Sequence, residues 1–114
     1  MSVHLFDASA NDWTEHPQFK GLFIKILETR ATHPGASITL TRLASGESIS
    51  THVHAVETET AYILAGRARL VAAGVETMLS ASAGATIAPG TPHSLHNTGQ
   101  STLELLAIHV PPVR

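Results

Sequence analysis

The segment from Gly46 to Gly66 reads G-E-S-I-S-T-H-V-H-A-V-E-T-E-T-A-Y-I-L-A-G. His52 and His54 are two residues apart, and on a strand such residues project from the same face, with backbones about 7 Å apart. Glu59 follows after a bend, at the start of the next predicted strand. The pattern predicts that two imidazoles and one carboxylate point into the same interior.

A second segment, from Gly84 to Asn97, reads G-A-T-I-A-P-G-T-P-H-S-L-H-N. Its prolines restrict the backbone of a turn, Pro89-Gly90-Thr91-Pro92, which immediately precedes His93. His93 would add a third imidazole to the first two. Three neutral imidazoles and one carboxylate form a donor set that divalent metals favour.

The two segments resemble the two sequence motifs of the cupin superfamily. The first motif is G-x5-H-x-H-x(3,4)-E-x6-G, and its fixed positions are matched by Gly46, His52, His54, Glu59 and Gly66. The second is G-x5-P-x-G-x2-H-x3-N, and it is matched at Gly90, His93 and Asn97. The sequence departs from the second motif upstream of Gly90. Ala88 stands at the motif's proline position, and Pro89 follows one residue later.

The resemblance implies an all-β fold, a small RmlC-like jelly roll or double-stranded β-helix barrel made of two packed sheets. It also implies that His52, His54, Glu59 and His93 are the ligands of one divalent metal ion. Mn, Fe, Ni, Co and Zn all suit this donor set, and the sequence does not choose among them. Glu57 is an alternative carboxylate ligand, because strand parity alone does not exclude it.

The rest of the chain fits an all-β fold. Short apolar runs are separated by Gly, Pro, Ser and Asn, which is typical of β-sandwiches and barrels. Residues 1–20 are predicted to form an N-terminal arm and residues 21–114 a single cupin domain. The predicted strands are Leu22–Glu28, Ser37–Leu43, Ile49–His54, Glu59–Leu64, Arg67–Ala72, Glu76–Leu79, Thr86–Ala88, His93–His96 and Thr102–Val110.

The composition excludes several classes of function. Only 14% of the residues are charged, against about 25% in a typical domain, which predicts self-association, and the resemblance favours a homodimer. The net charge is -2 and there is no basic run, so no nucleic-acid partner is expected. Cysteine is absent, which excludes thiol chemistry. No membrane-spanning stretch or secretion signal is visible, so a cytoplasmic protein is expected.

Other polar and aromatic residues receive ordinary interpretations. His96 is expected at the surface or an interface, because its parity is opposite to that of His93. Arg42 is predicted to be solvated or paired, the alternative being an inward Arg that meets a substrate carboxylate. Tyr62 is expected outside the site, in a dimer contact. Trp13 and Phe19 are expected to cover one end of the barrel. The remaining histidines, outside ligand spacing, are His4, His16, His33 and His109.

The function predicted from the sequence is that of a metal-dependent enzyme acting on a small molecule. The resemblance slightly favours dioxygenase chemistry over a Lewis-acid isomerisation or decarboxylation. The alternative is a non-catalytic module that binds or senses a sugar-like ligand, since a fold does not fix a function. The predicted pocket walls are small or aliphatic: Ile38, Leu40, Ala61, Ile63 and Ile87.

Overall fold

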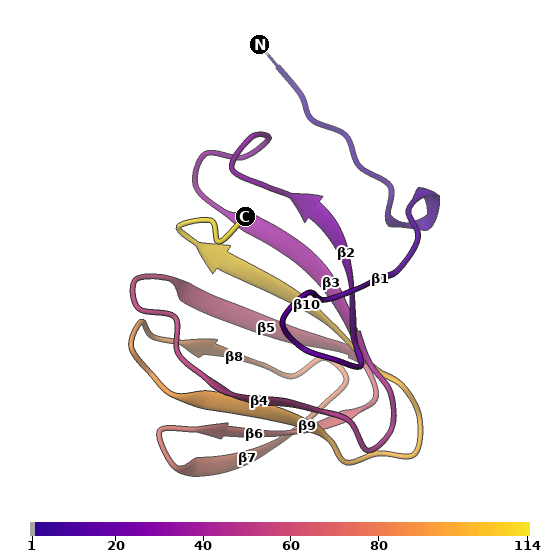
Figure 1. Ribbon diagram of the computed structural model, residues 1–114, viewed down its shortest axis with the longest axis vertical. Coiled ribbons are helices and arrows are strands. Elements are labelled where there is room, and N and C mark those ends of the chain that lie inside the picture. Colours follow the sequence, from indigo (N-terminus) through magenta and orange to yellow (C-terminus); the bar gives the residue numbers. More distant parts are fainter. Residues whose placement is uncertain (1) are drawn as a thin grey trace.

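The computed structural model describes residues 2–114, and its regular secondary structure is almost entirely antiparallel strand (Figure 1). One short 3₁₀ turn, η1, spans Ala8–Ala10. The strands are β1 (Thr14–Glu15), β2 (Leu22–Glu28), β3 (Ser37–Leu43), β4 (Ser48–His52), β5 (Thr58–Ala65), β6 (Arg67–Ala72), β7 (Val75–Ser80), β8 (Gly84–Ile87), β9 (His93–Asn97) and β10 (Leu103–Val110).

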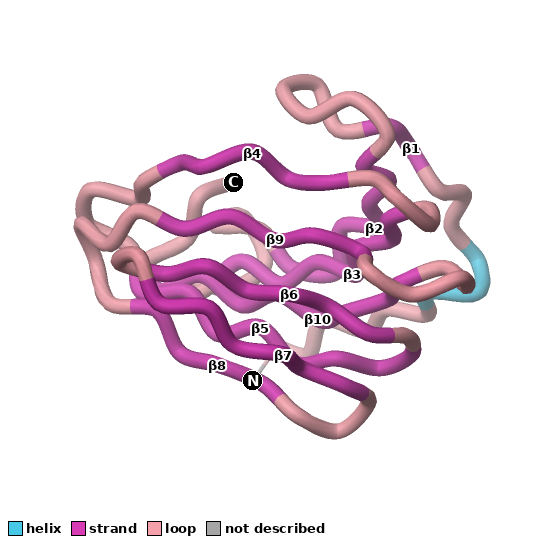
Figure 2. The backbone as a smooth tube through the Cα atoms, turned by 90° about the horizontal axis from the view of Figure 1, so that it is seen from below, coloured by secondary structure: helices cyan, strands magenta, loops and turns pink. Residues whose placement is uncertain are grey.

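The strands form two sheets that pack face to face, with the four-stranded sheet in front of the larger one in Figure 2. The larger sheet has the order β1-β2-β3-β10-β5-β8, and the smaller has the order β4-β9-β6-β7. Leu43, Ile63 and Leu103 are fully buried in the core between the sheets. The predicted all-β jelly-roll fold is confirmed. All nine predicted strands are present, and the sequence analysis missed only the two-residue β1.

Glycines make two of the hairpins possible. Between β5 and β6, Gly66 has a φ of 92°, and a Cβ there would lie 2.9 Å from the Thr102 carbonyl oxygen. Only a glycine meets both demands without strain. Between β6 and β7, Ala73 and Gly74 both have positive φ, as a two-residue hairpin turn requires.

The alternation along β3 corrects one prediction. Ser37, Thr39, Thr41 and Leu43 are buried, whereas Ile38 and Leu40 are only partly buried on the outer face. The predicted pocket walls Ile38 and Leu40 are therefore wrong, while Ala61, Ile63 and Ile87 do line the pocket. The interior of β3 is lined by hydroxyl groups, which a search for apolar residues overlooks.

The N-terminal arm covers part of the outer face of the large sheet. Trp13 lies there rather than at the end of the sandwich, with the Arg42 guanidinium 4.3 Å and the Lys25 ammonium 4.9 Å from the centre of a Trp13 ring. Arg42 also pairs with Glu104 at 3.3 Å, so it is a structurally paired surface residue as predicted. The predicted placement of Trp13 at the end of the sandwich is therefore wrong.

Within residues 2–114, no helix has the length and apolar character needed to cross a membrane.

Candidate metal centre

Two loops and two strand ends bring the motif residues together. His52 is the last residue of β4 and His93 the first residue of β9, and the register of these strands pairs the two directly. His54 lies in the turn after β4, and Glu59 is the second residue of β5. The Gly90 N–H donates a 2.8 Å hydrogen bond to the His54 carbonyl oxygen, which fixes the turn before His93 against the first motif.

The four predicted ligand side chains converge on one point. One nitrogen or oxygen atom from each of His52, His54, Glu59 and His93 lies within 4.8 Å of the others. A Glu59 oxygen lies 3.2 Å from His54 Nε2 and 3.6 Å from His93 Nε2. The His52 and His93 rings are 4.2 Å apart between centroids. The group could hold one metal ion.

Backbone carbonyls set the tautomers of two of these histidines. His52 Nδ1 lies 2.9 Å from the Ser50 carbonyl oxygen, and His93 Nδ1 lies 2.9 Å from the Thr91 carbonyl oxygen. Because a carbonyl oxygen only accepts, each Nδ1 must carry the proton and donate it. In the neutral rings, Nε2 then presents its lone pair to the cluster, as metal-binding histidines do.

The Nε2 atom of His93 provides a direct test of whether these residues fit a metal. This atom is buried and has no hydrogen-bond partner within the described chain. A buried polar atom without a partner costs free energy unless another group binds to it. The lone pair points to the cluster of the other three donors, so the arrangement fits a divalent cation.

His109 belongs to this cluster, although the sequence analysis treated it as ordinary. The pairing of β10 with β5 places His109 directly opposite Glu59, and its Nε2 lies 2.8 Å from a Glu59 oxygen. His109 is buried in line with Leu105 and Ala107. That alternation was a usable signal for an inward side chain, but the partner of β10 could not be read from the sequence.

The electrostatics of the cluster follow from one carboxylate among imidazoles. Burial raises the pKa of Glu59, but the neighbouring His109, His54 and His93 outweigh it and hold the pKa well below its usual range. The Glu59 carboxylate in turn raises the pKa of His93 against the effect of burial. Burial lowers the pKa of His52, which favours its neutral form. Glu59 is therefore ionised, as a metal-binding carboxylate must be.

Two other candidates lie outside the cluster. Glu57 approaches His54 Nδ1 at 3.9 Å, on the ring atom that does not face Glu59. It can therefore orient His54 but is not among the four converging residues. His96 is half-buried on β9, with Ser48 Oγ 2.8 Å from Nδ1 and Ser94 Oγ 3.0 Å from Nε2. It does not line the pocket.

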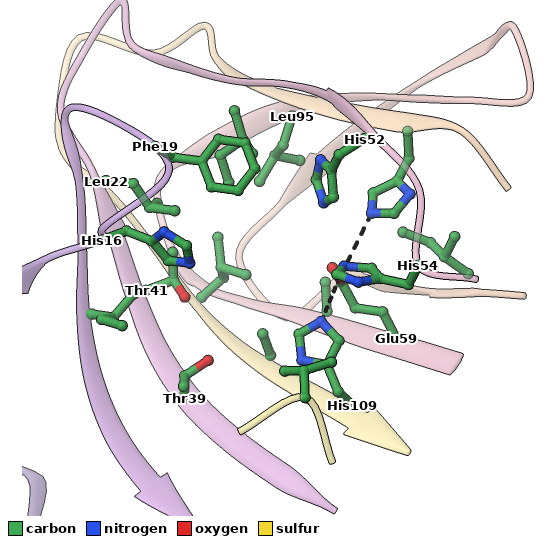
Figure 3. Close-up of a pocket in the computed structure, with 18 of the residues that line it drawn as sticks. His16, Phe19, Leu22, Thr39, Thr41, His52, His54, Glu59, Leu95 and His109 are labelled. Carbon is green, nitrogen blue, oxygen red and sulfur yellow. Dashed lines mark hydrogen bonds and ion pairs between the residues drawn. The ribbon is translucent and has the colours of Figure 1, made fainter. Parts of the chain in front are cut away.

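The cluster forms part of the wall of a cavity of about 480 Å³ between the two sheets (Figure 3). This volume is in the range typical of small-molecule sites. Most of the wall is aliphatic, from residues such as Leu22, Ile63 and Leu105. Phe19 lines the cavity as well, and its ring centroid lies 5.2 Å from that of His52. The candidate metal centre thus opens into a space that could receive a ligand.

The fold and the cluster together define a jelly-roll protein with a candidate His₃Glu metal centre in its interior. The profile of the family described as the cupin domain matches residues 39–109, which is more than half of the chain. The chain belongs to the cupin family.

Solved structures with the same fold agree with this assignment. The chain is similar to a protein from Thermotoga maritima described as a predicted oxalate decarboxylase, with 25% identity, a TM-score of 0.86 and coverage of 95% of this chain and 99% of that one. It is similar to KdgF from Halomonas sp., with 16% identity, a TM-score of 0.86 and coverage of 96% and 94%.

An RmlC-like cupin from Shewanella frigidimarina shares 18% identity at a TM-score of 0.82, over 99% of this chain and 95% of that one. The search of curated proteins found no match to this sequence. The two structures below 25% identity speak for the fold alone.

Proposed function

We propose that this protein is a metal-dependent enzyme that acts on a small molecule within the cavity. The observation that carries the proposal is the convergence of four donor atoms within 4.8 Å on the wall of a cavity of about 480 Å³. His52, His54, Glu59 and His93 would hold the ion. A purely structural metal site is closed by its ligands, whereas this one faces open space.

Two kinds of chemistry suit such a site. Four protein donors leave about two positions free on an octahedral ion. When bound, the ion would supply either a redox centre for dioxygenase-like cleavage or a Lewis acid for isomerisation or decarboxylation. The chain's own contribution is to hold Glu59 ionised, to fix two imidazole tautomers and to surround the substrate with an aliphatic wall. The likeness to a predicted oxalate decarboxylase supports the second chemistry.

The alternative is a non-catalytic module that binds a sugar-like molecule. The scarcity of aromatic groups around the cavity speaks against it, since Phe19 is the one Phe, Tyr or Trp among the described residues that line the wall. Stacking on aromatic rings is a common way to hold flat or ring-shaped ligands. A wall made mainly of aliphatic side chains is less suited to a sugar.

The first experiment is elemental analysis of untagged protein purified without added metal, followed by oxygen-uptake assays. About one equivalent of Fe, Mn, Ni or Co would support a catalytic centre, and the element would direct the choice between the two chemistries. No metal on purification, together with no binding on titration, would refute the proposal.

A matched pair of variants tests the carboxylate ligand. Glu59→Gln removes the anion at the centre of the cluster and should weaken metal binding by more than about 100-fold. Glu57→Gln should weaken it by about tenfold, at the lower end of the effect of a group that only orients a ligand. Both are partly buried neighbours of His54, at 3.2 Å and 3.9 Å. Titration with a competing chelator measures both affinities, and the reverse order would transfer the role to Glu57.

We further propose that the protein acts as a homodimer that pairs through the outer face of the large sheet. Cross-strand neighbours Leu40, Leu106 and Tyr62 form one row on this face, and Ile38 and Ile108 lie beside them in a second. Tyr62 is 43% exposed in the single chain. Contiguous apolar surface of this kind is typical of an interface.

The oligomeric state can be measured by light scattering after gel filtration. The expected mass is twice that of the 12.0 kDa chain. Tyr62→Glu should give the mass of one chain. Met78→Glu, at an exposed apolar position of the smaller sheet, should not change the mass. A wild-type protein with the mass of one chain would contradict the proposal.

A further inference from the structure

A second polar group lies in the cavity, away from the His/Glu cluster. Figure 3 shows His16 across the cavity from His54, Glu59 and His109. The Arg114 guanidinium also lines the cavity and approaches His16, with 3.1 Å between Arg114 Nη2 and His16 Nε2. Both side chains are partly buried. None of the cupin motif residues forms this end of the cavity.

The Arg114 guanidinium and the Gln18 backbone N–H both direct donors at His16, at Nε2 and at Nδ1, and a neutral imidazole can accept from only one of them. The backbone N–H of Gln18 donates to His16 Nδ1 at 3.0 Å, so Nδ1 must present its lone pair. The proton of His16 is then on Nε2, the atom that faces Arg114. A guanidinium has donors only. Neither group satisfies the other, and an acceptor placed between them would satisfy both.

The Arg114 guanidinium also differs from two other Arg side chains of this protein in having no ion-pair partner among residues 2–114. Among the described residues 2–114, no carboxylate oxygen forms an ion pair with its guanidinium, whereas Arg42 and Arg69 pair with Glu104 and Glu76 at 3.3 Å and 3.2 Å. Burial lowers the pKa of Arg114, and burial together with Arg114 lowers the pKa of His16. A partly buried guanidinium without an anion is unfavourable. Its position in a cavity indicates a bound anion as the missing partner.

The cationic side chains that line the cavity determine which class of anion fits it. Arg114 is the single Arg, and no Lys is present, among the described residues that line the cavity. One fixed positive charge matches one negative charge, and the planar fork of a guanidinium matches the two oxygens of a carboxylate. Between this end and the His/Glu cluster, the wall combines aliphatic side chains such as Leu22, Ile24 and Ile63 with the hydroxyl groups of Thr39 and Thr41. A phosphate dianion would remain half-neutralised there.

We propose that the cavity binds a small organic acid whose carboxylate accepts hydrogen bonds from the Arg114 guanidinium and from His16 Nε2–H. The apolar part of the acid lies along the aliphatic wall, and its other end reaches the His/Glu cluster. The inference deepens the proposed function and rests on it for the metal end of the ligand only. Arg114 takes the role of meeting a substrate carboxylate that Arg42, on the outer surface, cannot fill.

The test compares hexanoate with hexanamide, which have the same chain but differ in charge. The full-length protein is stripped of metal, so that the carboxylate cannot bind an ion instead, and each compound is titrated while backbone amide signals are recorded by NMR. Hexanoate should bind about tenfold or more tightly than hexanamide, since charge-assisted hydrogen bonds to a carboxylate differ from those to an amide by at least that factor. The largest signal changes should come from residues around His16 and Arg114.

Three variants distinguish the loss of the Arg114 charge from a loss of folding. Arg114→Gln should abolish the preference for hexanoate, and Arg114→Lys should retain part of it, because a Lys keeps the charge without the fork. Arg67→Gln is the matched control, because Arg67 is an exposed Arg on β6 that does not line the cavity. It should bind hexanoate as the wild type does. The dispersion of the NMR signals shows whether each variant is folded.

Several outcomes would overturn the inference: no hexanoate binding at millimolar concentration, equal binding of acid and amide, an unchanged preference in folded Arg114→Gln, or signal changes centred on His52 and His54. If Arg114→Gln does not fold, the result with Arg114→Lys decides. Complete loss of the preference in folded Arg67→Gln would also count against Arg114. Metal content is measured on the same preparation before it is stripped of metal. If the protein contains metal but does not prefer hexanoate, the inference fails and the proposed function stands. If it prefers hexanoate but binds no metal, the inference stands and the proposed function fails.

Discussion

Asn97 is buried at the end of β9, and its side chain makes three hydrogen bonds that close one edge of the sandwich. Its Nδ2 donates to the carbonyl oxygens of Leu43 and Ser101, both at 2.9 Å, and its Oδ1 accepts from the Gly99 N–H at 3.0 Å. The side chain therefore joins the end of β3 to the turn before β10. We predict that Asn97→Ala destabilises the fold by about 3 kcal/mol.

The estimate adds the three lost contacts. The Leu43 carbonyl is buried, so leaving it without a donor costs about 1–2 kcal/mol. The Ser101 and Gly99 groups are only partly buried and regain water, so each costs about 0.5–1 kcal/mol. For a chain of 114 residues, a loss of about 3 kcal/mol corresponds to a fall in Tm of about 12 °C.

Urea denaturation followed by circular dichroism measures the free energy of unfolding. The matched control is Asn11→Ala, which truncates an exposed Asn and should change the free energy by less than about 0.5 kcal/mol. Asn97→Asp should be at least as damaging as Asn97→Ala, because its carboxylate would face two carbonyl oxygens. A loss below about 1 kcal/mol for Asn97→Ala would refute the assignment of a structural role to these bonds.

Two further predictions concern a turn and the pH dependence of metal binding. Gly66→Ala combines a positive φ with a contact of 2.9 Å and should lower the free energy of unfolding by about 2–3 kcal/mol. Gly46→Ala has a positive φ but free space around the new Cβ and should lower it by about 1 kcal/mol. Equal losses in urea denaturation would show that the close approach at Gly66 is unimportant. Because Glu59 raises the pKa of His93, protons compete for this ligand, and the Zn²⁺ affinity should rise by up to about tenfold per pH unit from pH ~6 to ~7.5. In the metal-free protein, the raised pKa of His93 stabilises the fold below its unfolded value of about 6.5, and this stabilisation is lost as the pH rises through the folded value. A pH-independent Zn²⁺ affinity in chelator competition would contradict this account.

Local sequence patterns were sufficient to predict most of the fold. The bounds predicted for β2, β3 and β6 agree with the structure, because turn residues stand directly beside these strands. The convergence of His52, His54, Glu59 and His93 could also be predicted, since spacing and parity restrict where a short strand can direct its side chains. That these four residues bind metal is still a prediction.

The residues that were missed depend on contacts between distant parts of the chain. His109 joins the cluster through the register of β10 against β5. His16 and Arg114 are almost a hundred residues apart in the sequence, with a separation of 98, and no local pattern connects them. The parity of β3 was misread because its buried face carries hydroxyl groups and its outer face Ile38 and Leu40, which reverses the usual distribution.

The candidate ligands come from both layers of the sandwich. His52 and His93 belong to β4 and β9 in the smaller sheet, whereas Glu59 belongs to β5 in the larger one. A bound ion would therefore fasten the two layers to each other across the interior, and separating the layers would require its release. At a free metal concentration 100 times Kd, this linkage adds about 2.7 kcal/mol to the free energy of unfolding. Loss of metal would loosen the cavity itself, so the same ion would support both the shape of the binding space and the chemistry within it.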